Sequence, residues 1–422
     1  MADAPHPFRI RDFRFYWTAR FASTVAQMSM IVVIGWQVYD IARQTMSLEK
    51  AALQLGFIGL AQFVPLFALT LLTGWVADRV DRRIIARASI ALELLCAATL
   101  AWLTYSGSVT LPWLFAVAAL LGVARAFAGP ALGALAPNLV PRESLPRAIA
   151  LSSIAWQTGA IAGPAVGGYL YAVDPHMPYT VSAGLFALSL FCMLMIRPIA
   201  RTAIEGSTNP WRQMIDGLYY VRRNRLGLGA ISLDLFAVLL GGATAMLPVF
   251  ARDILHADAT VLGHLRAAPA VGATLTALYF SWRPMKYNVG TKMLVAVAVF
   301  GAATIVFGLS RNVMLSIACL ALLGSADMVS VYVRQSLIQL YTPDAMRGRV
   351  GAASTLFISA SNELGEAESG FLAALVGPVV AVVAGGVGAI AVTLLWARWF
   401  PELRRARTFD PPGQLPREGA TA

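Results

Sequence analysis

Residues 74–83, GWVADRVDRR, form a short charged turn between two long apolar stretches, Leu53–Val76 and Ile84–Leu103. Each stretch reaches the roughly 20 residues that an α-helix needs to cross the hydrocarbon core of a bilayer. The turn itself carries three arginines and two aspartates, which are costly to bury in lipid. The sequence around it therefore predicts two consecutive transmembrane helices joined by a polar turn.

The composition of the whole chain agrees with this local pattern. Of the 422 residues, 58% are hydrophobic and only 13% are charged, against roughly 25% in an ordinary soluble domain. The mean hydropathy is +0.66. Because so few charges cannot coat two or three soluble domains, we expect most of the surface to face lipid.

Apolar stretches of bilayer-spanning length recur along the chain, and none shows the strict alternation of barrel strands. We therefore predict an all-α membrane protein with 12 transmembrane helices in two six-helix, pseudo-symmetric halves. The predicted spans are Phe13–Tyr39, Leu53–Val76, Ile84–Leu103, Trp113–Ala134, Leu145–Tyr171, Tyr179–Ile196, Leu228–Phe250, Val261–Ser281, Thr291–Leu309, Val313–Ser336, Val350–Phe371 and Val376–Trp399.

The basic residues indicate the orientation of these spans. If both termini are cytoplasmic, 25 of the 33 Lys and Arg residues fall in cytoplasmic segments and only four fall in the opposite loops. This asymmetry is the positive-inside pattern of membrane proteins. The net charge of +11 is thus interpreted as a topology signal rather than as a nucleic-acid footprint.

The longest connection, residues 197–227, divides the chain. It contains a basic amphipathic stretch, Trp211–Arg225, which is typical of a helix lying in the membrane interface. We expect an N-terminal six-helix half at residues 1–196, a C-terminal half at residues 228–400 and a cytoplasmic tail at residues 401–422.

An internal repeat supports this division. A shift of 202 residues places Pro141 on Pro343 and Arg147 on Arg349, both in polar turns. Parallel repeats related by an axis along the membrane normal are an architecture of transporters.

The turn at residues 74–83 resembles the signature loop of the major facilitator superfamily, G-x-x-A-D-R-x-G-R-[KR], with Asp81 where the pattern has glycine. In that family the loop aspartate lies at a helix N-terminus across the domain interface, where the helix dipole favours a carboxylate. Asp78 is the matching position here, and Arg82 and Arg349 are candidates for its ion-pair partners. The alternative is a basic loop that only sets topology. The matching loop residues are Gly74, Asp78, Arg79 and Arg82.

The fifth span resembles the antiporter signature of the same superfamily, G-x-x-x-G-P-x-x-G-G. Glycines at this spacing make a flat face for close helix packing, and we expect the eighth span to pack against it. The resemblance implies export, whereas the alternative is packing with no bearing on direction. The matching residues are Gly159, Gly163, Pro164, Gly167 and Gly168.

Two further resemblances concern the fourth span and the branch of the superfamily. Arg125 lies in a stretch similar to the R-x-x-Q-G element, whose arginine is proposed to assist proton transfer, although Ala128 replaces the glutamine. Stretches such as residues 247–253, LPVFARD, and 361–366, SNELGE, resemble the enterobactin-exporter-like branch, which comprises drug and siderophore efflux proteins.

Charges inside the spans are functional candidates because they are expensive in lipid. Arg20, Arg125, Asp234 and Asp327 lie at similar depths on the first, fourth, seventh and tenth spans, which line the cavity in this fold. We hypothesise that they pair across the domain interface, close the cytoplasmic gate and release it when an aspartate is protonated. The alternative is static pairing that only neutralises buried charge.

Arg266, Glu363 and Glu366 are a second group of intramembrane charges, expected to form an outer gate or another proton site. Glu93 is interpreted as a structural partner on a peripheral span. Trp36 and Trp156 are candidate substrate contacts, although aromatic residues at span ends are often interface anchors.

These patterns favour a proton-coupled exporter of an organic small molecule in the bacterial inner membrane, working by alternating access. A substrate–proton importer of the same fold and a non-transporting sensor or scaffold remain alternatives. The substrate is expected to be a catechol-type siderophore, a macrolide-like drug or another amphipathic metabolite. We expect a monomer that contacts its substrate, protons and the lipid bilayer, without nucleic acid, metal, cofactor or enzymatic activity.

Overall fold

The computed structural model describes residues 5–198, 219–285, 287–342 and 344–408, and within these ranges the chain forms helices and no strand. The predicted linker helix at Trp211–Arg225 lies mostly outside the described residues, as does the end of the tail.

The helices follow the apolar spans of the sequence, and every predicted span coincides with helical structure. The first group comprises α1 (Arg11–Thr45), α2 (Leu48–Arg79), α3 (Arg82–Tyr105), α4 (Leu111–Leu135), α5 (Leu145–Val173) and α6 (Met177–Met195). The second comprises α8 (Arg225–Leu240), α9 (Leu247–Val249), α10 (Ala259–Trp282), α11 (Val289–Leu309), α12 (Val313–Tyr341), α13 (Asp344–Val376), α14 (Pro378–Trp399) and the short α15 (Pro401–Arg405).

In the part of the chain that the structure describes, nine of these helical segments are both long and apolar enough to cross a membrane. The helices α5, α10 and α13 span at least 24 residues but are not among the nine. The chain is therefore a multi-pass, all-helical membrane protein, and the number twelve stays a prediction.

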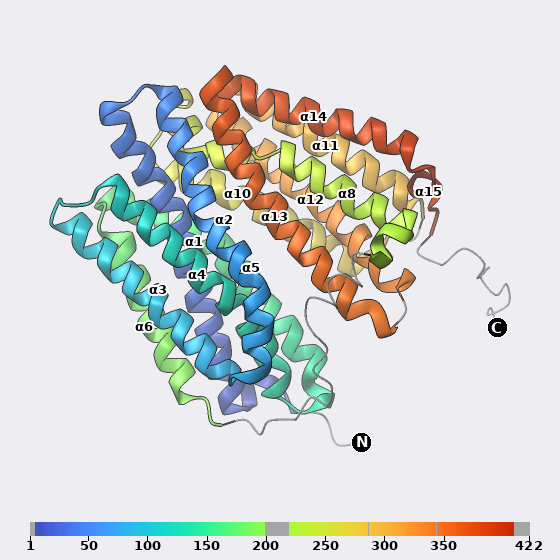
Figure 1. The fold of residues 1–422 in the computed structure, drawn as a ribbon, viewed down its shortest axis with the longest axis horizontal. Coiled ribbons are helices and arrows are strands. Elements are labelled where there is room, and N and C mark those ends of the chain that lie inside the picture. Colours follow the sequence, from blue (N-terminus) through green and yellow to red (C-terminus); the bar gives the residue numbers. More distant parts are fainter. Residues whose placement is uncertain (1–4, 199–218, 286, 343, 409–422) are drawn as a thin grey trace.

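The helices pack in two groups, α1–α6 and α8–α14, which touch mainly through α2 against α13 and α5 against α10. In Figure 1 the groups lie together at the end that contains the α1–α2 turn and diverge toward the end where the chain termini lie. We call these the joined end and the divergent end.

Glycines bring the two groups into backbone contact at the joined end. A Cβ atom added at Gly168 of α5 would lie 2.4 Å from the carbonyl oxygen of Ala259 and 3.0 Å from Cα of Gly263. A Cβ atom added at Gly370 of α13 would lie 2.4 Å from Cα of Gly56 in α2. Only glycine permits such close approach of helix backbones.

The glycine stripe of α5 packs mostly against α1 rather than α10. Cβ atoms added at Gly159, Gly163 and Gly167 would lie within 2.8 Å of atoms of Thr24, Met28 and Ser29, respectively. The prediction that the eighth span packs against the stripe is therefore right for Gly168 and wrong for these three glycines. Their four-residue spacing keeps Gly159, Gly163 and Gly167 on the same face of α5. Gly168 directly follows Gly167 and therefore points in a different direction around the helix axis, toward α10.

The seventh predicted span, Leu228–Phe250, is not a continuous helix. α8 ends at Leu240, and the chain continues through a 3₁₀ turn, η4 (Ala243–Met246), then α9 and a π-helical turn, η5 (Phe250–Ile254). The break occurs at Gly241–Gly242, where a Cβ atom on Gly242 would lie 2.3 Å from the carbonyl oxygen of Gly365. The glycine pair thus lets α13 approach closely and frees the segment after it to adopt its own geometry.

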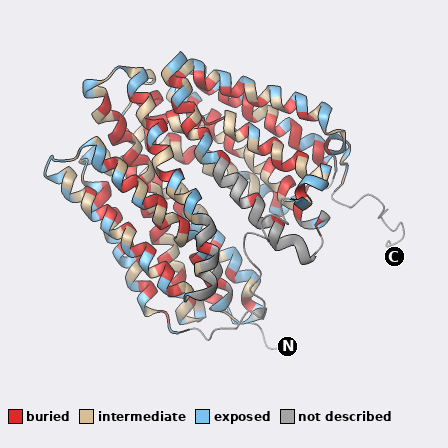
Figure 2. Cartoon of the chain, viewed as in Figure 1, coloured by how far each residue is buried: buried red, intermediate tan, exposed pale blue. Residues whose placement is uncertain are grey.

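Burial follows the contacts between helices. In Figure 2 buried positions run along the faces where helices meet, and exposed positions lie on the outer faces. Many exposed side chains are large and apolar, including Trp102 at 68% exposure and Trp282 at 84%. Such a surface is unfavourable in water and suits a bilayer.

Gly168→Ala should destabilise the protein, because the new methyl group must displace the backbone of α10. Overpacking of this kind costs about 1–3 kcal/mol. We expect a lower thermal unfolding temperature in detergent for Gly168→Ala. The matched control is Gly184→Ala in α6, where no atom lies within 4 Å of an added Cβ. Equal unfolding temperatures for the two variants would contradict the backbone contact.

Candidate functional site

A network of charged side chains joins the two helix groups at the joined end. Arg43 Nη2 at the end of α1 lies 3.1 Å from Asp253 Oδ1 of η5, and Asp40 of α1 pairs with Arg252 of η5. The Tyr39 hydroxyl donates a hydrogen bond of 2.6 Å to Asp253 Oδ2. Each helix therefore contributes one cation and one anion, and the two pairs are reciprocal.

Local backbone geometry places both charges of η5 against α1. Asp40 and Arg43 are three residues apart and share one face of α1. Arg252 and Asp253 are adjacent in sequence and lie in the π turn, a feature found often at functional sites. The charged side chains keep between 18% and 36% of their surface exposed, so the network is partly desolvated.

Sequence reasoning missed this network. Arg43 and Arg252 were counted among the four basic residues in the loops opposite the cytoplasm, and the predicted outer charge site was placed at Arg266, Glu363 and Glu366. A usable signal existed, because Asp-x-x-Arg at the end of the first span and Arg-Asp at the end of the seventh span are complementary in charge.

A second cluster lies inside the C-terminal group, between α8 and α12. Arg334, which is 2% exposed, forms an ion pair with Asp234, which is 4% exposed, and the Ser330 hydroxyl donates to Asp234 Oδ1 at 3.0 Å. Asp327 precedes Ser330 by one turn and lines a small cavity with Asp234 and Ser330. Among the described residues, Asp327 itself forms no hydrogen bond or ion pair. Two carboxylates thus line one small cavity, and only Asp234 is paired with the guanidinium group among the described residues.

The structure does not bring Arg20, Arg125, Asp234 and Asp327 together. Arg20 Nη1 donates to the Tyr16 hydroxyl at 3.3 Å, and Arg125 Nη1 donates to Gln62 Oε1 at 3.2 Å, both within the N-terminal group. Pairing across the interface therefore stays a prediction for a conformation in which the divergent end closes. The cation that neutralises Asp234 here is Arg334, to which sequence reasoning gave no role.

The predicted outer charge site is only partly described. Arg266 Nη2 of α10 lies 3.1 Å from Glu366 Oε1 of α13, and Arg266 Nη1 donates to the Thr244 carbonyl at 3.0 Å. The side chain of Glu363 lies outside the described residues. Arg266 thus connects α10 to α13 and to η4, all within the C-terminal group. These contacts do not reach the N-terminal group.

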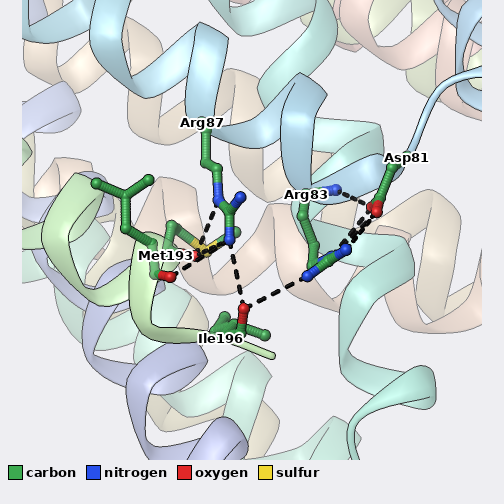
Figure 3. Close-up of polar contacts among 6 residues, drawn as sticks. Asp81, Arg83, Arg87, Met193 and Ile196 are labelled. Carbon is green, nitrogen blue, oxygen red and sulfur yellow. Dashed lines mark hydrogen bonds and ion pairs between the residues drawn. The ribbon is translucent and has the colours of Figure 1, made fainter. Parts of the chain in front are cut away.

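The signature loop is described on its α3 side. Asp81 caps α3 by accepting from the Arg83 backbone N–H at 2.9 Å, and it also pairs with the Arg83 guanidinium (Figure 3). Arg83 and Arg87 donate to the carbonyl of Ile196, and Arg87 also donates to that of Met193 at 2.9 Å.

The substitution of Asp81 for glycine therefore orients an arginine that ties α3 to the end of α6, where helix carbonyls lack partners. Arg82 is partly buried at the start of α3. The side chains of Asp78, Arg79 and Arg349 lie outside the described residues, and Gly74, which has no side chain, belongs to α2.

The two aromatic candidates differ in access. Trp36 is 8% exposed in the core, whereas Trp156 on α5 is 46% exposed. Of these two candidates, Trp156 is therefore the more exposed in this conformation. No group of three or more potential metal ligands occurs among the residues that the structure places.

Solved structures with this arrangement are transporters. One is a bacterial homologue of the human lysosomal transporter Spinster in an inward-facing and occupied conformation, with a TM-score of 0.72 at 14% identity, covering 95% of this chain and 99% of that chain. The xylose transporter XylE from E. coli in an inward-open conformation matches with a TM-score of 0.67 at 12% identity, covering 94% and 97%, respectively.

Curated relatives match along nearly the full length. The enterobactin exporter EntS of Escherichia coli O1:K1 / APEC is 28% identical over 409 residues, which is 94% of each protein. The corresponding exporter of Citrobacter koseri is 28% identical over 408 residues, covering 95% of this chain and 94% of the relative.

The two helix groups have the major facilitator fold of these solved structures, and the exporter relatives together with the family match identify this protein as a secondary transporter. Residues 2–411 match the family described as transmembrane secretion effector, and the chain belongs to that family of the major facilitator superfamily.

Arg43→Gln and Asp253→Asn should each lower the thermal unfolding temperature, because each leaves a partly buried charge without its partner. Combined, their effects should be less than additive, with a coupling energy of roughly 0.5–3 kcal/mol. The same cycle on Arg225 and Glu402, a pair with side chains 62% and 42% exposed, should show almost no coupling. Additive effects at Arg43 and Asp253 would show that the inter-group pair contributes nothing.

Proposed function

We propose that this protein is a proton-coupled exporter of an organic small molecule in the bacterial inner membrane, and that it works by alternating access. The observation that carries this proposal is the asymmetry between the two ends. Reciprocal ion pairs hold the halves together at the joined end, while the halves diverge at the other end.

The orientation follows from the basic residues. The divergent end carries both termini, and the segments on that side hold 25 of the 33 Lys and Arg residues. By the positive-inside rule this side faces the cytoplasm. The conformation described here would then be open to the cytoplasm and shut toward the periplasm, ready to accept substrate from inside the cell.

The moving parts in this proposal are the two halves, residues 1–196 and 228–400. The network of Tyr39, Asp40, Arg43, Arg252 and Asp253 serves as the periplasmic gate. Hydrogen bonds to charged groups contribute about 1.5–3 kcal/mol each, and partial exposure lowers that contribution. Such a gate is strong enough to hold one state and weak enough to open in each cycle.

The proton is assigned to the cluster of Asp234, Asp327 and Arg334. With both carboxylates ionised, this cluster has a net charge of −1 inside the membrane, which is costly. Protonation of Asp327 makes the cluster neutral. Because a proton changes the net buried charge, its binding can shift the balance between two conformations of the halves.

The substrate proposal rests on the relatives, whose names specify enterobactin. A catechol-type siderophore is therefore the first compound to test, with drug-like amphipathic molecules second. In this proposal the protein acts as a monomer, binds no nucleic acid and performs no chemical conversion of its substrate.

A deletion strain should secrete less of the physiological substrate than its parent, and comparing their secreted metabolites identifies that substrate.

In inverted membrane vesicles, an inside-acid gradient should drive accumulation of enterobactin. Accumulation under the opposite gradient would indicate an importer. No flux of any secreted metabolite under either gradient would leave a non-transporting role.

Asp327→Asn should abolish uphill transport and remove its pH dependence, because asparagine fixes the cluster in its neutral state. The measurement is gradient-driven accumulation in vesicles at several pH values. Asp258→Asn is the matched control, since Asp258 only caps α10 and asparagine caps a helix equally well. Wild-type activity with unchanged pH dependence in Asp327→Asn would refute the role of Asp327.

A further inference from the structure

A polar cluster in the middle of the N-terminal group has no role in the mechanism so far. It contains one side chain from each of four helices, and these are Gln27 of α1, Gln62 of α2, Glu93 of α3 and Arg125 of α4. Gln27 Nε2 donates to Glu93 Oε1 at 3.0 Å, and Arg125 Nη1 donates to Gln62 Oε1 at 3.2 Å.

Glu93 lies at the centre of a bilayer-spanning helix. It is 2% exposed and lies roughly 17 Å from either end of α3, at a rise of about 1.5 Å per residue. Intramembrane carboxylates are rare and usually paired with a cation. Yet the described residues give Glu93 one hydrogen bond, from a neutral amide, and no ion pair.

Among the residues that the structure describes, one cation acts on Glu93. α4 contributes Arg125, whose charge acts on the carboxyl group of Glu93. α1 contributes only the neutral Gln27, and α6, which packs along α3, has no acidic or basic residue in Met177–Met195. On α3 itself the neighbouring titratable group is the Cys96 thiol, one turn away.

The geometry around Arg125 is fixed by backbone contact. A Cβ atom added at Gly122, one turn before Arg125, would lie 2.3 Å from the carbonyl oxygen of Gln62. This approach of α2 and α4 holds the Gln62 amide against the guanidinium group. Arg125 Nη1 therefore contacts the Gln62 amide rather than Glu93 in this conformation.

We infer that Glu93 is a second proton-binding group, located in the N-terminal half and separate from the Asp327 cluster. The inference rests on the proposed proton-coupled export. When ionised, the carboxylate accepts the Gln27 N–H and is stabilised by the charge of Arg125. When protonated, the acid donates its O–H to the Gln27 carbonyl oxygen after a flip of that amide.

The polar neighbours of Glu93 differ from it in burial. Gln27 and Arg125 are both partly exposed, whereas Glu93 is buried. In this inference the proton arrives through these polar side chains and is held where the carboxyl group is shielded. Sequence reasoning treated Glu93 as a structural partner on a peripheral helix, and only the packing shows that its side chain reaches the amide of α1.

Infrared difference spectroscopy on the purified protein in lipid tests this inference without any substrate. A pH titration of the wild type should show two carbonyl stretches of protonated buried carboxyl groups, one from Glu93 and one from Asp327. Glu93→Gln should lose the Glu93 band and keep the other. Asp327→Asn should lose its own band and retain the Glu93 band, and the control Glu49→Gln, which changes an exposed glutamate, should retain both. Identical titrations of the wild type and Glu93→Gln would overturn the inference.

A second variant keeps the test valid if Glu93→Gln does not fold. Gln27→Leu leaves the carboxyl group in place and removes its hydrogen-bond partner. The midpoint of the Glu93 band should shift in Gln27→Leu, and an unshifted midpoint would contradict the proposed site.

Transport separates this inference from the proposed function. In proteoliposomes, Glu93→Gln should keep the exchange of enterobactin without a gradient but lose gradient-driven accumulation by between about 5- and 150-fold, the usual range of coupling between two sites. Unchanged gradient-driven accumulation would overturn the inference. If the wild type moves no enterobactin, the substrate proposal fails, and the infrared result still decides the role of Glu93.

Discussion

Two reciprocal ion pairs, Asp40 with Arg252 and Arg43 with Asp253, connect the halves of this transporter at one end. All four charges lie near the ends of bilayer-spanning segments, where water can replace each partner at moderate cost. The surrounding contact depends on backbones that meet at glycine, such as Gly168 against α10. Glycine contacts allow the approach, and the ion pairs favour one closed arrangement over others.

The charges deeper in the membrane follow a different rule, because their partners lie within the same half. Asp234 is neutralised by Arg334 within the C-terminal half, and Glu93 lies beside Arg125 within the N-terminal half. Neither cluster needs the other half for its stability in this conformation. The halves can therefore move as units, while a proton added to either cluster alters its net charge.

Much of the fold could be predicted from the sequence, because apolar length and the placement of arginines are properties of the chain alone. All the predicted spans coincide with helical structure, and the family resemblance at residues 74–83 agrees with the family match. The break at Gly241–Gly242 was missed because its cause is the close approach of α13. The partners of Gly159 and Gly163 were missed for the same reason, since packing partners depend on tertiary structure.

The candidate site was harder to predict. Arg125 and Asp327 were grouped because the sequence places them at similar depths in the membrane. Which side chains touch depends on the packing of the helices, and in the structure Arg125 contacts Gln62. Arg334 lies on the same face of α12 as Asp327 and Ser330, a spacing that could have revealed it. The ion pairs between α1 and η5 depend on where α1 ends and on the π-helical turn of η5. A π-helical turn leaves no periodic pattern in the sequence, so these pairs could not be predicted from it.

The central claim is that the joined end is held shut by the pairs between α1 and η5. Its most direct test measures spin-label distances by pulsed electron resonance, with one label pair at Gln44 and Arg311 and another at Arg9 and Arg404. Relative to the labelled parent, Asp40→Asn combined with Asp253→Asn should lengthen the first distance and shorten the second. Unchanged distance distributions at both ends would contradict the account.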